Sequence, residues 1–194
     1  VTATGGTFAA GADTGTVVAA ICGDFAAGDS DVAAVTVSTA TDASTLIPAP
    51  RRDLAAGIKG RSTENTVTIN AEKDQTANVT LSGANIDVSS AGKAAVSTTG
   101  EGNVSIELDG ENTLKSDEGH AGLEKNNGGS LTIADEDKNG KLTAEGGKYG
   151  AGIGGGYYEN GSDITITGGE VMATGGEYGA GVGGGDHGNG SDIS

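Results

Sequence analysis

An acidic turn, DEDKNG, begins at Asp135 and holds the side chains best suited to bind a metal ion. Asp135, Asp137 and Asn139 alternate along it, as the oxygen ligands do in the first half of a calcium-binding loop. Gly140 follows, at the position where such a loop turns sharply. The twelfth loop position is Gly146 rather than the glutamate that binds calcium through both oxygens. The motif therefore predicts a calcium site at these three residues, with a solvated acidic turn as the alternative.

All four tyrosines of the chain lie in glycine-rich segments of its C-terminal quarter: Tyr149, Tyr157, Tyr158 and Tyr178. Flat apolar rings beside hydrogen-bond acceptors are typical of surfaces that bind sugars. Tyr149 and Tyr178 precede two copies of the same glycine-rich segment, and we expect their rings to stack, with Lys148 paired to Glu177 beside them. The tyrosines predict a carbohydrate-binding face. The alternative is a ladder of rings that only stiffens the fold.

The segment GAGIGGG begins at Gly150 and returns as GAGVGGG at Gly179. Its first six residues fit the G-x-G-x-x-G pattern of dinucleotide-binding turns. That pattern needs a helix after the glycines to hold the pyrophosphate. The residues after Gly156 are YYENGSD and then another strand pattern. We therefore interpret the glycines as structural and exclude a nucleotide site.

The other polar residues do not form a catalytic group. The chain shows no pair of nucleophile and base, and its acidic residues are scattered rather than clustered with a positioned Arg or Lys. His120 and His187 have no second His or Cys at a metal-ligand spacing, so we expect both at the surface. Asn112 falls at an inward position and is expected to bond to the backbone of a turn. The sequence predicts a protein that is not an enzyme.

An internal repeat positions these candidate residues. GSDITITGGEVMATGGEYGAGVGGGDHGN begins at Gly161, and the next copy begins at Gly190, the same spacing that separates the two glycine-rich segments above. Weaker copies precede it. Each copy holds three segments with apolar residues at alternate positions, exemplified by Ile164 and Ile166, Val171 and Ala173, and Ala180 and Val182. Alternation with a period of two indicates strands with one buried face.

Three short strands in each repeat of about 25–30 residues predict an all-β fold, a parallel β-solenoid of the right-handed β-helix type. About seven rungs fit in the chain at about 4.8 Å a rung. In aligning the copies, we place Val79 and Leu81 over Val104 and Ile106. We expect residues 1–50 to form irregular solenoid rungs or a cap, and residues 51–194 to form regular repeats, within one continuous domain.

The composition excludes several classes of partner. The chain has 194 residues and a net charge of −16, which opposes binding to nucleic acid or to anionic membrane surfaces. Its longest apolar run, from Val17 to Cys22, is too short to insert into a membrane. Cys22 is the single cysteine, so it has no partner within the chain for a disulfide. Ice binding, which needs a regular threonine array, is less favoured because the predicted outer column is mixed: Ser82, Glu107, Ala134 and Thr167.

A resemblance to known proteins covers about residues 65–194. The repeats LTIADEDKNGKLTAEGGKYGAGIGGG and ITITGGEVMATGGEYGAGVGGG resemble glycine-rich β-helix repeats in large surface proteins of Gram-positive bacteria. The segments NVTLSGANIDVSS and VSIELDGENTLKSD are similar to β-helical carbohydrate-binding domains of clostridia-like bacteria. The resemblance implies an extracellular protein, secreted or attached to the cell wall, that binds acidic polysaccharide with calcium.

The two ends of the chain interrupt the repeat. Val1 aligns with the second segment of a copy, and Ser194 lies in the first segment of another. Since an open solenoid end exposes unpaired backbone groups, we expect a fragment of a longer array or subunits that associate head to tail into a fibre. The main functional prediction is a non-enzymatic structural or adhesive protein of a bacterial surface. The alternative is a carbohydrate-binding module assisted by calcium.

Overall fold

The computed structural model describes residues 24–25, 35–39 and 56–194, with side chains from Gly57 onward. Nowhere in these ranges is there a helix that could cross a membrane. Their strands are β1 (Asp24–Phe25), β2 (Val35–Thr39), β3 (Ala56–Ser62), β4 (Val67–Ala71), β5 (Thr76–Asp87), β6 (Val96–Gly100), β7 (Asn103–Asp109), β8 (Glu111–Lys115), β9 (Leu123–Lys125), β10 (Leu131–Ala134), β11 (Lys141–Glu145), β12 (Ile153–Gly154), β13 (Gly161–Ile166), β14 (Glu170–Thr174), β15 (Val182–Gly183) and β16 (Gly190–Ile193). Most of the irregular unit predicted over residues 1–50 lies outside the described residues, as does Cys22.

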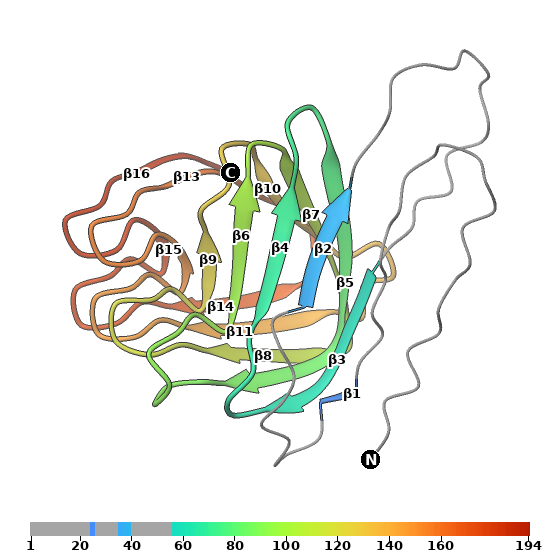
Figure 1. Ribbon diagram of the computed structural model, residues 1–194, viewed down its shortest axis with the longest axis horizontal. Helices are drawn as coiled ribbons and strands as arrows, with labels where there is room; N and C mark the ends of the chain where they lie inside the picture. Colours follow the sequence, from blue (N-terminus) through green and yellow to red (C-terminus); the bar gives the residue numbers. More distant parts are fainter. Residues whose placement is uncertain (1–23, 26–34, 40–55) are drawn as a thin grey trace.

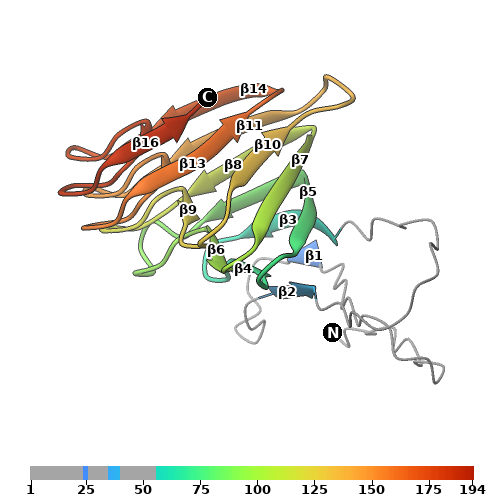
Figure 2. The ribbon, with the colours of Figure 1, turned by 90° about the horizontal axis from the view of Figure 1, so that it is seen from above.

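The described strands pair in parallel and form two sheets wound into a solenoid (Figures 1 and 2). One sheet has the order β14-β11-β8-β5-β7-β10-β13-β16, and the other has the order β15-β12-β9-β6-β4-β2. The described part makes about four turns of roughly 29 residues. The prediction of a parallel β-solenoid is therefore confirmed. The predicted seven rungs referred to the whole chain, and four turns is the number that the described part supports.

The first sheet has two arms that meet at β5. Residues 76–82 of this strand pair with β7, whereas residues 85–87 pair with β8. Between them, Gly83 has a φ of 71°, a backbone conformation that favours glycine. Gly110 occupies the same corner one turn later, between β7 and β8, with a φ of 62°. In the next turn, the DEDKNG segment fills this corner between β10 and β11.

Ladders of apolar side chains fill the interior of the coil. One ladder rises through four turns and consists of Val79, Ile106, Ile133 and Ile166. Neighbouring turns supply the apolar surface that one turn of this fold lacks. The hydrophobic core otherwise consists mainly of Leu, Ile, Val and Ala from both sheets.

The pairing of β5 with β7 corrects one predicted register. Val79 lies beside Ile106, and Ala77 lies beside Val104, so the predicted alignment is wrong by two residues. A shift by two keeps every apolar side chain on the inner face, so alternation alone could not detect the error. The outer column is corrected too, because Thr80 rather than Ser82 lies beside Glu107.

Asn112 is buried at 2% exposure in the inward column that also contains Leu142. Its Oδ1 accepts a hydrogen bond of 2.9 Å from the Ala84 amide. Its Nδ2 donates to the carbonyl groups of Asp109, Gly110 and Lys141 at 3.1–3.2 Å. The prediction that this residue bonds to backbone at a turn is confirmed.

The GAGIGGG segment also has the structural role that the repeat predicted. Ala151 and Ile153 are fully buried, and β12 pairs with β15 of the next turn. Gly154 has a φ of 131°, and a Cβ atom there would collide with the carbonyl oxygen of Gly183. Glycine at this position therefore permits both the backbone conformation and the close approach of two turns.

Substitution of Gly154 by alanine is expected to lower the free energy of unfolding by about 2 kcal/mol or more, because it combines a strained φ with a steric collision. Gly57→Ala is the matched control, since a Cβ at Gly57 has no atom within 4 Å. Urea unfolding followed by circular dichroism measures both variants. Equal stability of the two would contradict this account of the glycine-rich segment.

Candidate functional site

Aromatic side chains from two corners of the coil gather into one exposed group. Tyr149 lies between β11 and β12, and Tyr178 lies between β14 and β15 one turn later. Their rings stack with centroids 5.5 Å apart and planes at 15°, which confirms the predicted stacking. Tyr157 lies 5.0 Å from Tyr149 and 4.2 Å from Tyr158. The structure therefore brings all four predicted tyrosines together.

His187 extends this group by one more ring. It is stacked on Tyr158 with centroids 4.9 Å apart and planes at 11°, and its Nε2 lies 3.7 Å from Asp186 Oδ2. The surface position predicted for His187 is confirmed, but its contact with the tyrosines was missed. Tyr158 and His187 occupy the same position in successive copies of the repeat, and this equivalence was the signal that could have revealed it. We call Tyr149, Tyr157, Tyr158, Tyr178 and His187 the aromatic patch.

The patch is exposed, and part of it is strained. Tyr157, Tyr158 and Tyr178 are 42%, 64% and 52% exposed. Tyr158 and His187 both have a φ of 63°, in the left-handed region that costs a residue other than glycine about 1–2 kcal/mol. The two corners thus carry large exposed rings at positions where glycine would fit with less strain.

Charged groups surround the rings. Lys148 Nζ lies 5.0 Å from the centroid of the Tyr149 ring and 5.8 Å from that of Tyr178. A hydrogen bond with Tyr149 raises the pKa of Lys148, and the charge of Glu177 adds to the effect. Glu177 itself accepts a hydrogen bond from the Tyr178 hydroxyl, which raises the pKa of that tyrosine. The expected direct pairing of Lys148 with Glu177 is replaced by these contacts with the rings.

Tyr157 has the most perturbed hydroxyl group of the patch. Its hydrogen bond with Tyr158, together with partial desolvation and the charge of Asp186, raises its pKa to about 12. Tyr157 therefore stays protonated and uncharged at neutral pH. The hydroxyl groups of the patch can thus donate and accept hydrogen bonds, as recognition of a polar ligand requires.

The predicted calcium ligands lie at the opposite end of β11 from Tyr149. The Asp135 carboxylate accepts hydrogen bonds from the amides of Asn139 and Gly140, at 3.2 and 3.1 Å, and so closes its own turn. Asn139 Nδ2 donates to Asp109 Oδ1 at 3.3 Å, and Asp137 is exposed.

A groove of about 340 Å³ lies beside this turn and is lined by Asp135, Lys138, Asn139, Gly140, Lys141, Gly169 and Glu170. It therefore combines two cationic with two anionic side chains. In the part of the chain that the structure describes, no three His, Cys, Asp or Glu residues are arranged to hold a metal ion. Calcium at Asp135, Asp137 and Asn139 stays a prediction.

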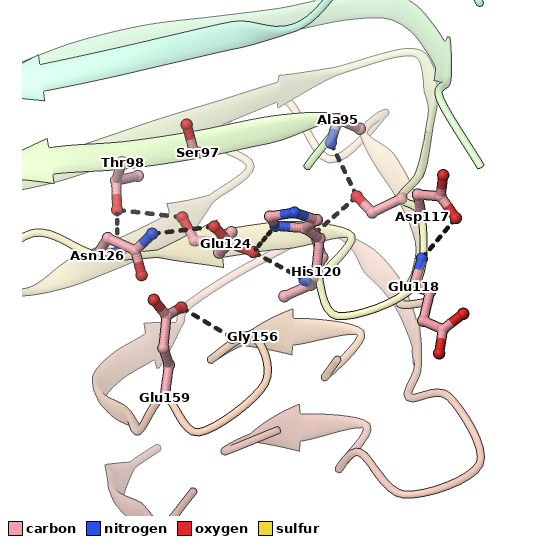
Figure 3. A network of polar contacts seen from close by, with 12 residues as sticks. Ala95, Ser97, Thr98, Asp117, Glu118, His120, Glu124, Asn126, Gly156 and Glu159 are labelled. Carbon is pink, nitrogen blue, oxygen red and sulfur yellow. Dashed lines mark hydrogen bonds and ion pairs between the residues drawn. The ribbon is translucent and has the colours of Figure 1, made fainter. Parts of the chain in front are cut away.

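A buried polar cluster is centred on Glu124 in β9, which pairs with β12 of the next turn. Figure 3 shows its contacts. Glu124 in β9 is 6% exposed. Its Oε2 accepts a hydrogen bond of 3.1 Å from the Ala121 amide and lies 2.8 Å from His120 Nδ1. Its Oε1 accepts one of 3.0 Å from Asn126 Nδ2. His120, expected at the surface, is half-buried with a side chain that is 36% exposed.

Sequence reasoning missed this cluster, although a signal was present. Glu124 and Lys125 stand at positions where the next copy of the repeat has glycines, Gly154 and Gly155. Lys125 is also buried, and desolvation lowers its pKa. Charged side chains rarely replace glycine at buried positions of a repeat without a local role.

Comparison of the chain with protein-family models, with curated proteins and with solved structures found no match. The fold, a β-solenoid of about four turns, and the geometry of its surface are the basis for assigning a function.

If calcium binds at the DEDKNG turn, millimolar calcium is expected to raise the melting temperature by several degrees, because a ligand at 100 times its Kd stabilises a protein by about 2.7 kcal/mol. Asp137→Ala should abolish the shift, whereas Asp74→Asn, an exposed acid on another turn, should preserve it. Differential scanning calorimetry with calcium and then EDTA measures the effect. An unchanged melting temperature would contradict the calcium site.

Proposed function

We propose that the protein is a non-enzymatic, structural or adhesive β-solenoid of a bacterial surface, and that its aromatic patch binds extracellular polysaccharide. The observation that carries the proposal is a contiguous group of five rings, four of them exposed and Tyr149 half-buried, with two of the five at left-handed backbone positions. Aromatic faces offer apolar surface to the C–H groups of a sugar ring, and neighbouring polar groups bind its hydroxyls.

The patch is built on a rigid support. The Tyr178 amide donates to the Lys148 carbonyl at 3.1 Å, and the Tyr158 amide donates to the Asp186 carbonyl at 2.9 Å. The Asp186 amide in turn donates to the Tyr149 carbonyl at 2.8 Å. These bonds join both corners of two successive turns. A ligand that binds this patch therefore orders little of the protein, which favours affinity.

A ladder that only stiffens the fold does not account for the strain. Stacking of two aromatic rings contributes about 0.5–1.5 kcal/mol. The left-handed conformations of Tyr158 and His187 together cost about 2–4 kcal/mol at 1–2 kcal/mol for each residue. The part of the stacking energy that goes beyond area burial is therefore smaller than the strain at these two residues. Recognition of a ligand gives a reason for rings at these two corners.

Replacement of Tyr158 by glycine separates the two explanations. Glycine relieves the strained φ and keeps the amide hydrogen bond to Asp186. We expect the variant to be as stable as the wild type or up to about 1 kcal/mol more stable, and to bind polysaccharide at least tenfold more weakly. Thermal unfolding and a glycan array measure the two properties.

Met172→Ala is the matched control for this variant, because Met172 is 61% exposed on β14 and lies outside the patch. It should preserve binding. A Tyr158→Gly protein that loses stability but binds as the wild type does would support the stiffening ladder and contradict the proposal.

Head-to-tail association is the second candidate function. The observation that favours it is the match between successive turns, in which Gly161, Ser162 and Ile164 pair with identical residues of the next turn. Turns of such similar sequence can stack on turns of another copy in the same register.

If copies associate in this way, the molar mass measured by light scattering should rise steadily with protein concentration, and electron microscopy should show rods of variable length. Tyr158 is 64% exposed at the corner between β12 and β13 and makes no strand pairing, so Tyr158→Gly serves as the control that should leave the mass distribution unchanged. A monodisperse monomer at high concentration would contradict a fibre.

A further inference from the structure

The lower boundary of the aromatic patch is at Gly119. The backbone of Gly179 packs directly on Gly150, and that of Gly150 packs on His120. Tyr178, Tyr149 and Gly119, which precede these residues, therefore occupy equivalent places on three successive turns. Gly119 has no ring to continue the ladder. His120 and Glu124 thus lie where the stacked tyrosines end.

Tyr157 connects the patch to this polar cluster. Its amide donates a hydrogen bond of 2.8 Å to the Gly119 carbonyl, and its Cβ lies 3.8 Å from the place that a side chain of Gly119 would take. The loop that carries Tyr157 also covers Glu124, because a Cβ on Gly156 would lie 3.0 Å from Glu124 Oε2. The corner that carries Tyr157 therefore borders the residues next to His120 and Glu124.

The contacts of Glu124 fix which nitrogen of His120 carries hydrogen. Glu124 also accepts hydrogen bonds from the Ala121 amide and from Asn126, so its buried carboxylate serves as an acceptor throughout. His120 Nδ1, at 2.8 Å from Oε2, is accordingly the donor of that pair. In the neutral ring, Nε2 then has a free lone pair and acts as an acceptor.

Acidic groups dominate the surroundings of the patch. The Asp117 carbonyl accepts a hydrogen bond of 3.0 Å from the His120 amide, and Glu124 contacts the ring of His120. Glu159 Oε2 accepts a bond of 3.1 Å from the Gly156 amide.

The upper part of the patch carries two more acids, Glu177 beside Tyr178 and Asp186 beside His187. The opposing charge is Lys148, which is already engaged with the rings of Tyr149 and Tyr178. The raised pKa values of Tyr157 and Tyr178 agree with this, since hydrogen bonds and nearby acids both disfavour a negative charge on the hydroxyls.

Building on the proposed polysaccharide-binding function, we infer that the patch selects an uncharged, hydroxyl-rich glycan, and that His120, positioned by Glu124, accepts a hydrogen bond from one sugar hydroxyl. A hydroxyl group can donate to His120 Nε2. A carboxylate or a sulfate only accepts hydrogen bonds, so it would leave Nε2 without a donor and would also face the acids around the patch. Because such polymers keep other hydroxyl groups that can donate to Nε2, the patch discriminates against uronic and sulfated polymers chiefly through charge.

The test uses the full chain and matched probes. Immobilised β-1,4-glucan, β-1,3-glucan, mannan and dextran are the neutral probes, and polygalacturonate and dextran sulfate are the acidic ones. Surface plasmon resonance at physiological salt, with and without EDTA, measures binding. We expect binding to at least one neutral probe, at least tenfold weaker binding to both acidic probes, and no effect of EDTA.

Two variants test the role of His120 and its neighbour. His120→Ala should weaken binding to the neutral probe about tenfold, which corresponds to the loss of one hydrogen bond to the ligand. Glu124→Gln keeps an oxygen for the Ala121 amide and removes one negative charge, so it should narrow the preference for neutral over acidic probes. Thr165→Ala, on the outer face of β13, is the control. It should change neither the affinity for the neutral probe nor the preference for neutral over acidic probes. Melting temperatures establish that each variant is folded.

The outcomes separate this inference from the proposed function. Binding to an acidic probe in preference to the neutral ones, if abolished by Tyr158→Gly, overturns the neutral specificity and keeps the polysaccharide-binding function. Unchanged neutral binding by folded His120→Ala overturns the assignment of His120 alone. Wild-type binding that survives Tyr158→Gly, or no binding to any probe, overturns the function and the inference together.

Discussion

Parallel pairing between successive turns is the interaction on which the rest of this structure depends. Hydrogen bonds between strands hold each turn over the previous one, with Gly161 over Gly190 and Ile153 over Val182. The separation of paired strands, about 4.8 Å, is set by backbone geometry rather than by side chains. Consequently, residues at equivalent positions of the repeat stand in columns, and a column can change its chemistry from one turn to the next, as where Asn112 lies beside Leu142 and Glu124 beside Gly154. The core, the glycine corners and the aromatic patch are all columns of this kind.

The corners of the coil show where the close stacking of turns imposes backbone strain. At Gly154 the turns approach so closely that only a hydrogen atom fits between them, and the backbone is free to adopt the required φ. At Tyr158 and His187 the same kind of corner carries a ring and a strained backbone instead. The surrounding ladder of backbone hydrogen bonds tolerates this local cost because it is cooperative along the stack. A rigid support thus permits side chains that an isolated loop of the same sequence would not hold in place.

Sequence alone could predict whatever the repeat determines. The alternation of Ile164 and Ile166, the stacking of Tyr149 on Tyr178 and the structural role of Asn112 all follow from spacing and residue type. The pairing of Val79 with Ile106 could not be predicted from the sequence, because a register shifted by two residues keeps the same side chains facing inward. The Glu124 cluster was missed for a different reason. It depends on departures from the repeat, and its burial arises from a loop of the next turn that no periodicity describes.

The equivalence of Tyr158 and His187 has a consequence for how such a surface grows. Each turn of this kind adds one ring to a row that runs along the axis of the stack, at a step fixed by the strand separation. A linear polymer lying along that row would meet one aromatic ring on each turn, a tyrosine at position 158 and a histidine at position 187, so its affinity would increase steeply with the number of turns through avidity. Affinity in a surface of this design is therefore adjusted by duplicating one copy of the repeat, without any change in the chemistry of a single contact.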